Sequence, residues 1–354
     1  MTGELYEKNR YFHEDIRDIC KVNFIPWEQL AESSILITGS TGLIGSMLVG
    51  TLVYLNKIKH INSSIFCLVR DEKKAKEKLR SMSIDIEDIC FLEGCVEHLP
   101  QINDTIDFII HGASRTSSRE FITNPVEVIE TSVIGTKNLL NFAKEKGVKR
   151  LLYMSSMEVY GYPQQGCRVT EKHAGALSPL EIRNSYPISK QMCEVLCCAF
   201  SSEYNVPTSI IRLTQTFGPG VHICDKRIFA YFARCVKNRE DIILRTMGDT
   251  KRSYLYIADA VTAIFTVLFK GADGQAYNAA NERTFCSIYE MAELVAADND
   301  IQLKIELDNN VDRGYANTLY MDLDTTLLQS IGWKMIGEGY SLREMYRRMI
   351  ADIE

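Results

Sequence analysis

The sequence predicts an α/β fold, with a doubly wound parallel sheet and a smaller C-terminal lobe. A glycine-punctuated turn, Thr38–Gly45, lies between an apolar run, Ser34–Ile37, and a helical pattern, Leu43–Leu55. A second apolar run, Ile65–Val69, follows at the distance that a βαβ unit requires. With 354 residues, 46% of them hydrophobic, the chain is long enough for one α/β unit and a smaller lobe.

Residues 1–31 precede the first predicted strand, and a helical pattern extends from Tyr6 to Cys20. We expect an N-terminal helical extension here. Three roles for it stay open: it packs against the body, it caps a ligand cleft, or it joins a contact between two copies of the chain.

The turn Thr38–Gly45 has the features of a pyrophosphate site. Gly39 lets the chain turn, Gly42 lets the backbone approach phosphates, and Gly45 lets the helix pack close to the sheet. Free N–H groups and the dipole of the following helix favour an anion. The alternative, a glycine turn without a ligand, fits the flanking strand and helix less well. The predicted cofactor-binding residues of the turn are Gly39, Ser40, Thr41, Gly42, Leu43, Ile44 and Gly45.

The second strand ends in Val69-Arg70-Asp71, which bears on the choice of dinucleotide. A carboxylate at this point accepts from the ribose 2′-OH of NAD, whereas an arginine suits the 2′-phosphate of NADP. Arg70 therefore favours NADP, and Asp71 keeps NAD open. The alternative reading of Arg70 is a surface cation at a strand end.

Tyr186 and Lys190 lie four residues apart in a helical pattern, so they share one helix face. A cation beside a phenol favours the phenolate and lowers its pKa, which makes Tyr186 an acid/base candidate. On its own, such a pair is more often a solvated helix face. The apolar run Leu151–Ser156 ends in two hydroxyls, and in open α/β sheets the carboxyl ends of strands line the ligand crevice.

With these motifs, the chain resembles the extended short-chain dehydrogenase/reductase superfamily, with its Rossmann-type fold, and in particular the nucleotide-sugar epimerase/dehydratase branch. The resemblance covers nearly the whole chain from Ser34 onward. Its landmarks, in order, are the glycine turn, Ile109–Ser114, Gly135–Leu140, Ser155–Gly161, Tyr186–Lys190, Phe217–Pro219, Arg252–Asp259 and Tyr277-Asn278.

The resemblance implies roles for individual residues. Tyr186 exchanges a proton with a sugar hydroxyl, Lys190 binds the nicotinamide ribose and lowers the tyrosine pKa, and Ser156 hydrogen-bonds the same sugar oxygen. Alcohol oxidation removes a proton and a hydride together, so Tyr186 takes the proton while the cofactor takes the hydride at sugar C4. The implied cofactor contacts also include Ala113 and Ser114, and Ser114 and Glu158 are implied substrate contacts.

Several positions depart from the pattern of this branch. Sugar 4,6-dehydratases carry an acidic pair after the catalytic hydroxyl, where this chain has Met157-Glu158. A thioether cannot protonate a leaving group. Glu158 remains as a base or as a group that orients the sugar. Without the acid for 4,6-dehydration, the expected reaction is epimerisation, decarboxylation of a uronate, or keto-reduction. Gly94-Cys95 replaces a Gly-Asp whose carboxylate accepts from the adenine amino group, and Ser132 replaces an asparagine at the start of a helix.

A second resemblance supports reduction as an alternative function. Phe66–Arg70, followed by the charged helix Asp71–Arg80, looks like the cofactor-selecting segment of NADPH-dependent thioester reductases. It covers about twenty residues, so it informs the cofactor more than the substrate.

The resemblance divides the chain into a dinucleotide-binding part at 32–206 and a mainly substrate-binding lobe at 207–354, interleaved with the first part. Gln215 takes the place of an asparagine that contacts phosphate or sugar. Arginines suit a diphosphate because they bind it in a bidentate manner. The implied substrate contacts in this lobe are therefore Gln215, Arg227, Arg252 and Arg313.

Composition excludes other classes of protein. A net charge of −6 and a pI near 5.7 argue against a nucleic-acid partner. Eleven cysteines without metal-ligand spacing predict reduced thiols, no metal site and a cytoplasmic location. No apolar stretch is long enough to span a membrane, and no signal peptide is recognisable. A homodimer, formed through Asn124–Lys146 and Ser185–Tyr204, is implied by the resemblance.

Two hypotheses from different classes follow. The first is an enzyme that acts on a nucleotide-linked sugar through a bound nicotinamide dinucleotide. The second is a dinucleotide-binding sensor that has kept the fold but lost turnover, since fold alone does not prove activity. The presence of Ser156, Tyr186 and Lys190 favours the enzyme.

Overall fold

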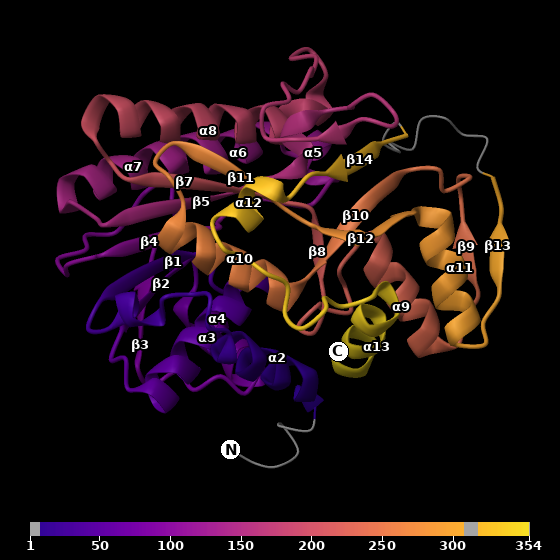
Figure 1. The fold of residues 1–354 in the computed structure, drawn as a ribbon, viewed down its shortest axis with the longest axis horizontal. Coiled ribbons are helices and arrows are strands. Elements are labelled where there is room, and N and C mark those ends of the chain that lie inside the picture. Colours follow the sequence, from indigo (N-terminus) through magenta and orange to yellow (C-terminus); the bar gives the residue numbers. More distant parts are fainter. Residues whose placement is uncertain (1–7, 308–317, 354) are drawn as a thin grey trace.

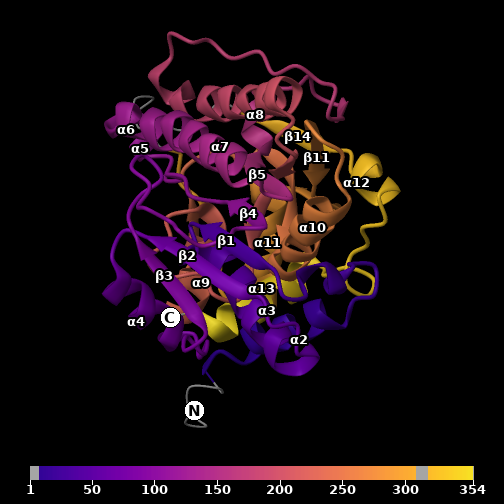
Figure 2. The same ribbon diagram turned by 90° about the vertical axis from the view of Figure 1, so that its left-hand side faces the viewer.

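The computed structural model describes residues 8–307 and 318–353. Its centre is a seven-stranded parallel sheet in the order β11-β7-β5-β4-β1-β2-β3, with helices on both faces (Figures 1 and 2). This architecture confirms the predicted doubly wound fold. The strands are β1 (Ser34–Thr38), β2 (Ser64–Val69), β3 (Ile89–Glu93), β4 (Phe108–His111), β5 (Arg150–Ser156), β7 (Thr208–Leu213) and β11 (Gln275–Ala279).

The central strands contribute alternate side chains to two apolar cores. In β1, Ile35 and Ile37 belong to one core and Leu36 to the other. A strand that is buried on both faces reads as a continuous apolar run, which is why these strands were recognisable in the sequence. The helices of the first core include α3 (Leu43–Lys59) and α10 (Ile257–Lys270), and those of the second are α7 (Gly135–Lys146) and α8 (Ser185–Tyr204).

The N-terminal extension packs against the body of the molecule. Its helix, α2 (Arg10–Lys21), contacts α3, α10 and the last helix, α13 (Leu342–Asp352). The buried side chains of α2 recur every three or four residues and join the first core, as an amphipathic helix requires. They are Phe12, Ile16, Ile19 and Cys20.

The smaller lobe lies to the right in Figure 1 and is built on a five-stranded sheet. Its path is β12-β10-β14-β6, and β8 pairs with β10. The strands are β6 (Arg168–Val169), β8 (Gln215–Phe217), β10 (Lys251–Tyr256), β12 (Asn281–Ser287) and β14 (Tyr320–Leu323). A separate pair, β9 (Ile242–Leu244) and β13 (Leu303–Ile305), lies beside α9 (Ile228–Asn238) and α11 (Ile288–Asp298).

The chain crosses between the two lobes several times. The short strand β6 precedes residue 207 and yet belongs to the smaller sheet. In the other direction, β7 and β11 follow residue 206 and complete the large sheet. The two lobes therefore meet along the carboxyl end of the large sheet, where ligands bind in this fold class.

The predicted helix Asn124–Lys146 is interrupted. It consists of α6 (Pro125–Ile129), a π-helical turn (Glu130–Ile134) and α7. Such π-turns inside helices are often found at functional sites. The remaining short elements are 3₁₀ turns at Trp27–Leu30, Met157–Tyr160 and Ile182–Asn184, and the helices α4 (Glu72–Ser81), α5 (Glu120–Thr123) and α12 (Thr326–Ser330).

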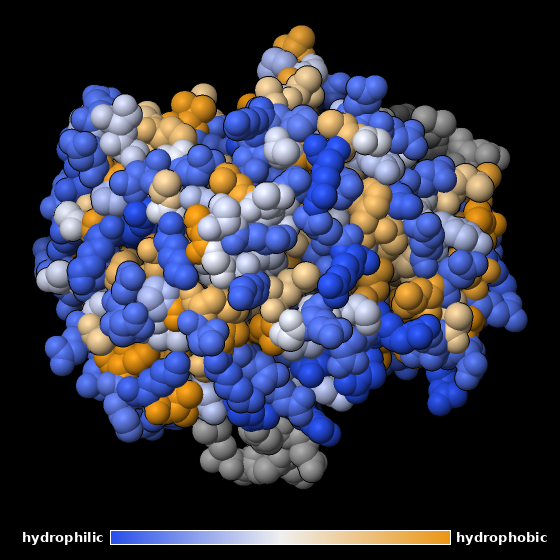
Figure 3. Space-filling view, in the orientation of Figure 1, coloured by the Kyte–Doolittle hydropathy of each residue, from blue (hydrophilic) through white to orange (hydrophobic). Residues whose placement is uncertain are grey.

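The surface is predominantly polar. Figure 3 shows hydrophilic residues over most of one face, with hydrophobic residues in scattered groups. Among the helices of residues 8–307 and 318–353, none combines the length and the apolar character that a membrane span requires.

Candidate active site

The glycine turn joins β1 to α3 with almost no space between them. Gly39 has φ +73°, a left-handed conformation that favours glycine, and a Cβ there would lie 2.8 Å from the carbonyl carbon of Gly112. A Cβ on Gly45 would lie 2.1 Å from the carbonyl oxygen of Gly39. Helix α3 begins after Gly42 without a side-chain cap, so N–H groups of its first turn stay free for an anion.

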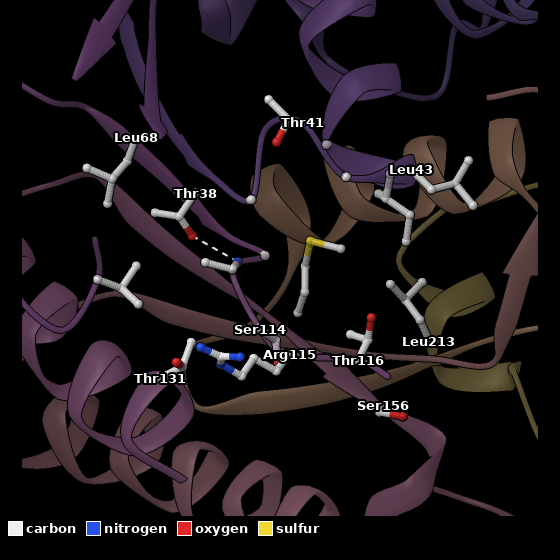
Figure 4. Close-up of a pocket in the computed structure, with 18 of the residues that line it drawn as sticks. Thr38, Thr41, Leu43, Leu68, Ser114, Arg115, Thr116, Thr131, Ser156 and Leu213 are labelled. Atoms are coloured by element: carbon white, nitrogen blue, oxygen red, sulfur yellow. Dashed lines mark hydrogen bonds between the residues drawn. The ribbon is translucent and has the colours of Figure 1, made fainter. Parts of the chain in front are cut away.

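A cavity of about 960 Å³ opens at this turn and extends to the smaller lobe. Figure 4 shows side chains converging on it from the turn (Thr41, Leu43), from β5 (Ser156) and from the end of β7 (Leu213). The predicted residues that line it are Gly39, Thr41, Gly42, Leu43, Ile44, Gly45, Arg70, Asp71, Ala113, Ser114, Ser156, Glu158, Tyr186, Lys190, Gln215 and Arg227. Ser40 is buried and does not line the cavity.

A buried network orders the strand ends beneath the cavity. The Thr38 hydroxyl lies 2.8 Å from Nδ1 of His111, and Nε2 of His111 lies 3.1 Å from the Thr136 hydroxyl. The Thr38 oxygen also accepts from the N–H of Ala113 at 3.1 Å (Figure 4). Burial lowers the pKa of His111 to about 3, so the ring is neutral at pH 7. The ring bridges the hydroxyls of Thr38 and Thr136. In the sequence, His111 is only part of the landmark Ile109–Ser114.

Lys190 lies under the cavity with its ammonium group buried. Its Nζ donates a hydrogen bond to the carbonyl oxygen of Met154 at 2.7 Å and lies 4.7 Å from the centre of the Tyr153 ring. The side chain is 3% exposed, and burial lowers its pKa to about 8. An ammonium of this pKa loses its proton more readily than an exposed lysine does.

Several groups besides Lys190 act on the Tyr186 hydroxyl. Burial raises the pKa of the Tyr186 hydroxyl, the carboxylate of Glu158 raises it further, and Ser156 and Arg227 lower it. The Lys190 Nζ is 5.7 Å from the centre of the Tyr186 ring, and it donates its hydrogen bond to the main chain instead. In this arrangement the phenol holds its proton more strongly than an exposed tyrosine does.

Phe121 fixes the ring of Tyr186. The two rings stack with their centroids 4.5 Å apart and their planes 4° apart. The carbonyl oxygen of Phe121 accepts a hydrogen bond from the Ser185 hydroxyl at 3.0 Å, which ties α5 to the start of α8. Sequence reasoning missed Phe121, because nothing in a local pattern indicates a contact across 65 positions.

Ser156 and Glu158 lie at the end of β5. The Ser156 oxygen accepts from the N–H of Glu158 at 3.2 Å and caps the short turn Met157–Tyr160. Burial raises the pKa of Glu158, and the charges of Arg183 and Arg252 oppose that shift. The carboxyl group is therefore easier to protonate than an exposed glutamate, with two cations near it.

A second buried network of hydrogen bonds holds the end of β5 in place. Glu194 accepts hydrogen bonds from Ser155 at 2.6 Å and from Arg212 at 2.9 and 2.6 Å. Arg212 also donates to the Tyr160 hydroxyl at 2.7 Å. The pair joins β7, α8 and the strand that carries Ser156, so that strand has little freedom to move.

Only some of the residues predicted to contact the diphosphate line the cavity. Gln215 and Arg227 line the cavity, and Arg227 forms an ion pair with Asp225 at 2.6 Å. Arg252 is not a lining residue, although its charge acts on Glu158. Arg313 lies outside the residues that the structure describes.

The structure adds lining residues that the sequence analysis did not name. Arg115 and Thr116 follow Ser114 in the loop after β4, and Thr131 comes from the π-turn. Arg115 is held by two carboxylates, Glu120 at 2.9 Å and Glu127 at 2.6 Å. For Arg115 and Thr116, the signal available in the sequence was their location directly after the predicted Ala113-Ser114 strand end.

Comparisons with known proteins agree with this site. The model of the NAD dependent epimerase/dehydratase family matches residues 35–280. The chain belongs to this family. The predicted resemblance is thereby confirmed, and with it the expectation of an enzyme that depends on a nicotinamide dinucleotide. The glycine turn fits such a cofactor, because its cradle leaves no room for a Cβ and presents free N–H groups.

Individual relatives in the family differ in the reactions that their names state. The chain is 30% identical to UDP-glucuronic acid decarboxylase 6 of Arabidopsis thaliana over 265 residues, which are 74% of this chain and 73% of that protein. It is 26% identical to dTDP-D-glucose 4,6-dehydratase of Mus musculus, over 85% of this chain and 83% of the relative. A solved structure of dTDP-glucose 4,6-dehydratase from Bacillus anthracis, in complex with NAD, superposes with a TM-score of 0.72 at 20% identity, covering 90% of this chain and 95% of that one.

Proposed function

We propose that this family member modifies a sugar carried by a nucleoside diphosphate, through hydride transfer at C4 with Tyr186 as the acid/base. The main support for the proposal is that one cavity brings together the glycine turn with Ser156, Tyr186 and Lys190. Relatives that act on UDP-glucuronic acid and dTDP-glucose support the substrate class.

The residues divide the chemistry of alcohol oxidation between them. A bound nicotinamide dinucleotide supplies the hydride acceptor. In its phenolate form, Tyr186 takes the proton of the sugar hydroxyl, and the Ser156 hydroxyl donates a hydrogen bond to the same oxygen. Lys190 is held by the Met154 carbonyl at the floor of the cavity, where its charge favours the phenolate once Tyr186 has lost its proton. Phe121 keeps the phenol ring in one plane.

Gln215 and Arg227 are proposed to bind the nucleoside diphosphate, with Arg252 close by. Arg227 is braced by Asp225, whose carboxylate accepts from Nε and Nη2 of the same guanidinium. A braced guanidinium loses less conformational entropy when it binds a phosphate. Arg313 remains a proposed contact from the sequence alone.

Decarboxylation of a nucleotide-linked uronate is a second candidate within this mechanism. Glu158 lies near Arg183 and Arg252, two cations that suit a substrate carboxylate. Oxidation at C4 would place a ketone β to the C6 carboxylate of a uronate. The C5–C6 bond would then break, with release of carbon dioxide and protonation of C5, and the C4 ketone would be reduced with the hydride that a bound dinucleotide holds. Dehydratases of the branch carry an acid where this chain has Met157. Because a thioether cannot protonate a leaving group, loss of the 6-OH is disfavoured.

The reaction is tested with UDP-, dTDP-, GDP- and CDP-linked sugars and uronates, by reduced-nicotinamide absorbance and mass spectrometry. Product without net absorbance change supports internal oxidation and reduction, and loss of 44 mass units, the mass of carbon dioxide, identifies decarboxylation. Net cofactor consumption identifies a reductase or a dehydrogenase instead. Tyr186→Phe is expected to lower turnover by about 10²- to 10⁴-fold, with dinucleotide affinity unchanged. If Tyr186→Phe retains wild-type turnover, the proposed role of this residue is wrong.

A homodimer is part of the proposal. The helices α6, α7 and α8 lie side by side on one flank (Figures 1 and 2), and large apolar side chains are exposed along α6, the π-turn and α8. Sedimentation is expected to give twice the 40.2 kDa mass of one chain, and a monomer at micromolar concentration contradicts the dimer. The exposed apolar residues are Val126, Ile129, Ile134, Met192 and Val195.

A cytoplasmic location completes the proposal. All eleven cysteines are unpaired, and Cys67, Cys193 and Cys197 are fully buried. Reduced thiols are the norm in the cytosol and rare in secreted proteins. Thiol titration of the denatured native protein is expected to find eleven reactive groups, and a lower count would show disulfides and contradict this location.

A further inference from the structure

The ring of Tyr186 belongs to a small apolar cluster of its own. The buried members of this cluster are Phe121, Val128 and Tyr186, and they are separate from the two cores that flank the large sheet. Phe121 comes from α5, Val128 from α6 and Tyr186 from the first turn of α8. The ring of the proposed acid/base therefore packs against two short helices rather than against a main core.

Neither of these two helices is stable by itself. Helix α5 has four residues and α6 has five, and helices this short form only when tertiary contacts support them. Neither has a side-chain hydrogen bond at its N-cap. The positions of Phe121 and Val128 therefore depend on contacts that other residues make with α5 and α6.

Arg115 makes such a contact with both helices. Its Nη1 donates a hydrogen bond to Glu120 of α5 at 2.9 Å, and its Nη2 forms an ion pair with Glu127 of α6 at 2.6 Å. Phe121 directly follows Glu120, and Val128 directly follows Glu127. Each carboxylate that binds Arg115 is therefore next in sequence to a member of the small apolar cluster.

The balance of charge argues against Arg115 as a binding group for an anionic ligand. Arg115 lines the cavity (Figure 4), and its Nε is buried without a hydrogen-bond partner in the part of the chain that the structure describes. Its one positive charge lies between two negative charges, Glu120 and Glu127. These carboxylates repel a further anion. The planar fork of a guanidinium does suit the joining of two carboxylates.

We propose that Arg115 is a positioning residue for the reaction, because it holds α5 and α6 together and so fixes the place of the Tyr186 ring. Arg115, Glu120 and Glu127 are called the Arg115 clamp below. The proposal rests on the proposed function, which gives Tyr186 the acid/base role. Partly exposed ion pairs add little to stability, whereas a reacting group displaced by about 1 Å can lose about 10²-fold in rate. We therefore expect the clamp to affect turnover more than stability.

Kinetics of Arg115→Met, with the nucleotide-linked sugar that the wild-type enzyme converts, tests the proposal. We expect kcat to fall about 10-fold, with KM and dinucleotide affinity changed by less than about twofold. The pH at which the rate is half-maximal is expected to stay in place, since Arg115 is not among the main influences on the Tyr186 pKa. Arg115→Lys is expected to restore part of the loss, because a lysine lacks the fork. The matched control is Arg119→Met, at an exposed arginine of the same loop that does not line the cavity.

A double variant tests whether Arg115 acts through Phe121. Phe121→Leu removes the ring that stacks on Tyr186 and is expected to lower kcat by itself. If the two residues act in one chain of contacts, the double variant has almost the same kcat as the more impaired single variant. Losses that multiply, as for independent sites, would overturn the proposal.

Hydrogen exchange of residues 117–128 separates this inference from the proposed function. The exchange is expected to be faster in Arg115→Met than in the wild type, whatever the reaction is. Unchanged exchange overturns the clamp, and so does a wild-type kcat in Arg115→Met. A KM or a dinucleotide Kd that rises about 10-fold at unchanged kcat identifies a ligand-binding residue instead and also overturns it. If exchange rises but the wild-type protein converts no nucleotide-linked sugar, the proposed function fails rather than the clamp.

Discussion

At the scale of single residues, the chemistry depends on how charges near Tyr186 are balanced. Burial and the carboxylate of Glu158 raise the pKa of the phenol, while Ser156 and Arg227 lower it. Glu158 is itself made easier to protonate by burial. The two groups are coupled, because each negative charge disfavours the other. Under the proposed function, Glu158 thus acts on the reaction through Tyr186 as well as through any contact with the substrate.

Replacing Glu158 by glutamine is expected to shift the pH dependence of sugar oxidation. The change removes a negative charge that raises the Tyr186 pKa, so that pKa falls, and the rise of the rate with pH moves to lower pH by about one unit. The measurement is the single-turnover rate of cofactor reduction between pH 6 and 10. In the control, Glu203→Gln, an exposed carboxylate at the end of α8 is removed and the profile stays in place. A rise that moves to higher pH would refute the coupling.

At the scale of elements, the unit that places the cofactor is β1, the glycine turn and α3. The turn is held between two strand ends, since Gly39 touches Gly112 and the Thr38 hydroxyl binds the N–H of Ala113. The contact between Gly45 and the Gly39 carbonyl joins the helix to the turn through backbone alone. Backbone contacts of this kind cannot relax by a rotamer change.

Gly45→Ala is expected to abolish dinucleotide binding and to destabilise the fold by about 1–3 kcal/mol or more, because the new Cβ meets backbone atoms. Gly50→Ala is the matched control on α3. Its Cβ meets Cδ1 of Ile16 at 2.7 Å, the end of a flexible side chain that can move away. Thermal unfolding and calorimetric titration measure both effects. Similar losses in the two variants would mean that the close approach at Gly45 has no special role.

At the scale of the whole molecule, a buried ion pair joins the two ends of the chain. Asp15 of α2 is fully buried and accepts hydrogen bonds from the Tyr256 hydroxyl and from Arg348 of α13, both at 2.6 Å. Burial raises the pKa of Asp15, and Tyr256 and Arg348 oppose that shift. Helix α2 also packs on α3, so it connects the cofactor-binding part to the smaller lobe.

Arg348→Met is expected to lower the free energy of unfolding by about 3–5 kcal/mol at pH 7, because it leaves the Asp15 charge buried without its cation. Neutralising Asp15 relieves the penalty, so the loss shrinks as pH falls toward 5. Arg347→Met is the control, since its side chain is 54% exposed and its removal costs about 0–1 kcal/mol. Urea unfolding at both pH values measures the difference. A loss that is equal for the two variants, or independent of pH, contradicts a buried ion pair.

Much of the architecture was readable from the sequence because its signals are local. The parallel strands are apolar runs such as Ser34–Ile37, and Gly39, Gly42 and Gly45 mark the turn that follows. The Tyr186–Lys190 spacing is likewise a property of one helix. The sequence by itself thus determined the fold class, the glycine turn and the spacing of the proposed catalytic pair, since each depends on residues within one or two elements.

Only the tertiary structure decided the environment of those residues. The raised pKa of Tyr186 and the stacking of Phe121 on its ring arise from burial and from contacts that folding brings together. The packing of α2 was one of three open roles until its buried face was placed against α3 and α13. Electrostatic shifts depend on distances and on the loss of water, and neither quantity is encoded in the spacing of residues along a chain.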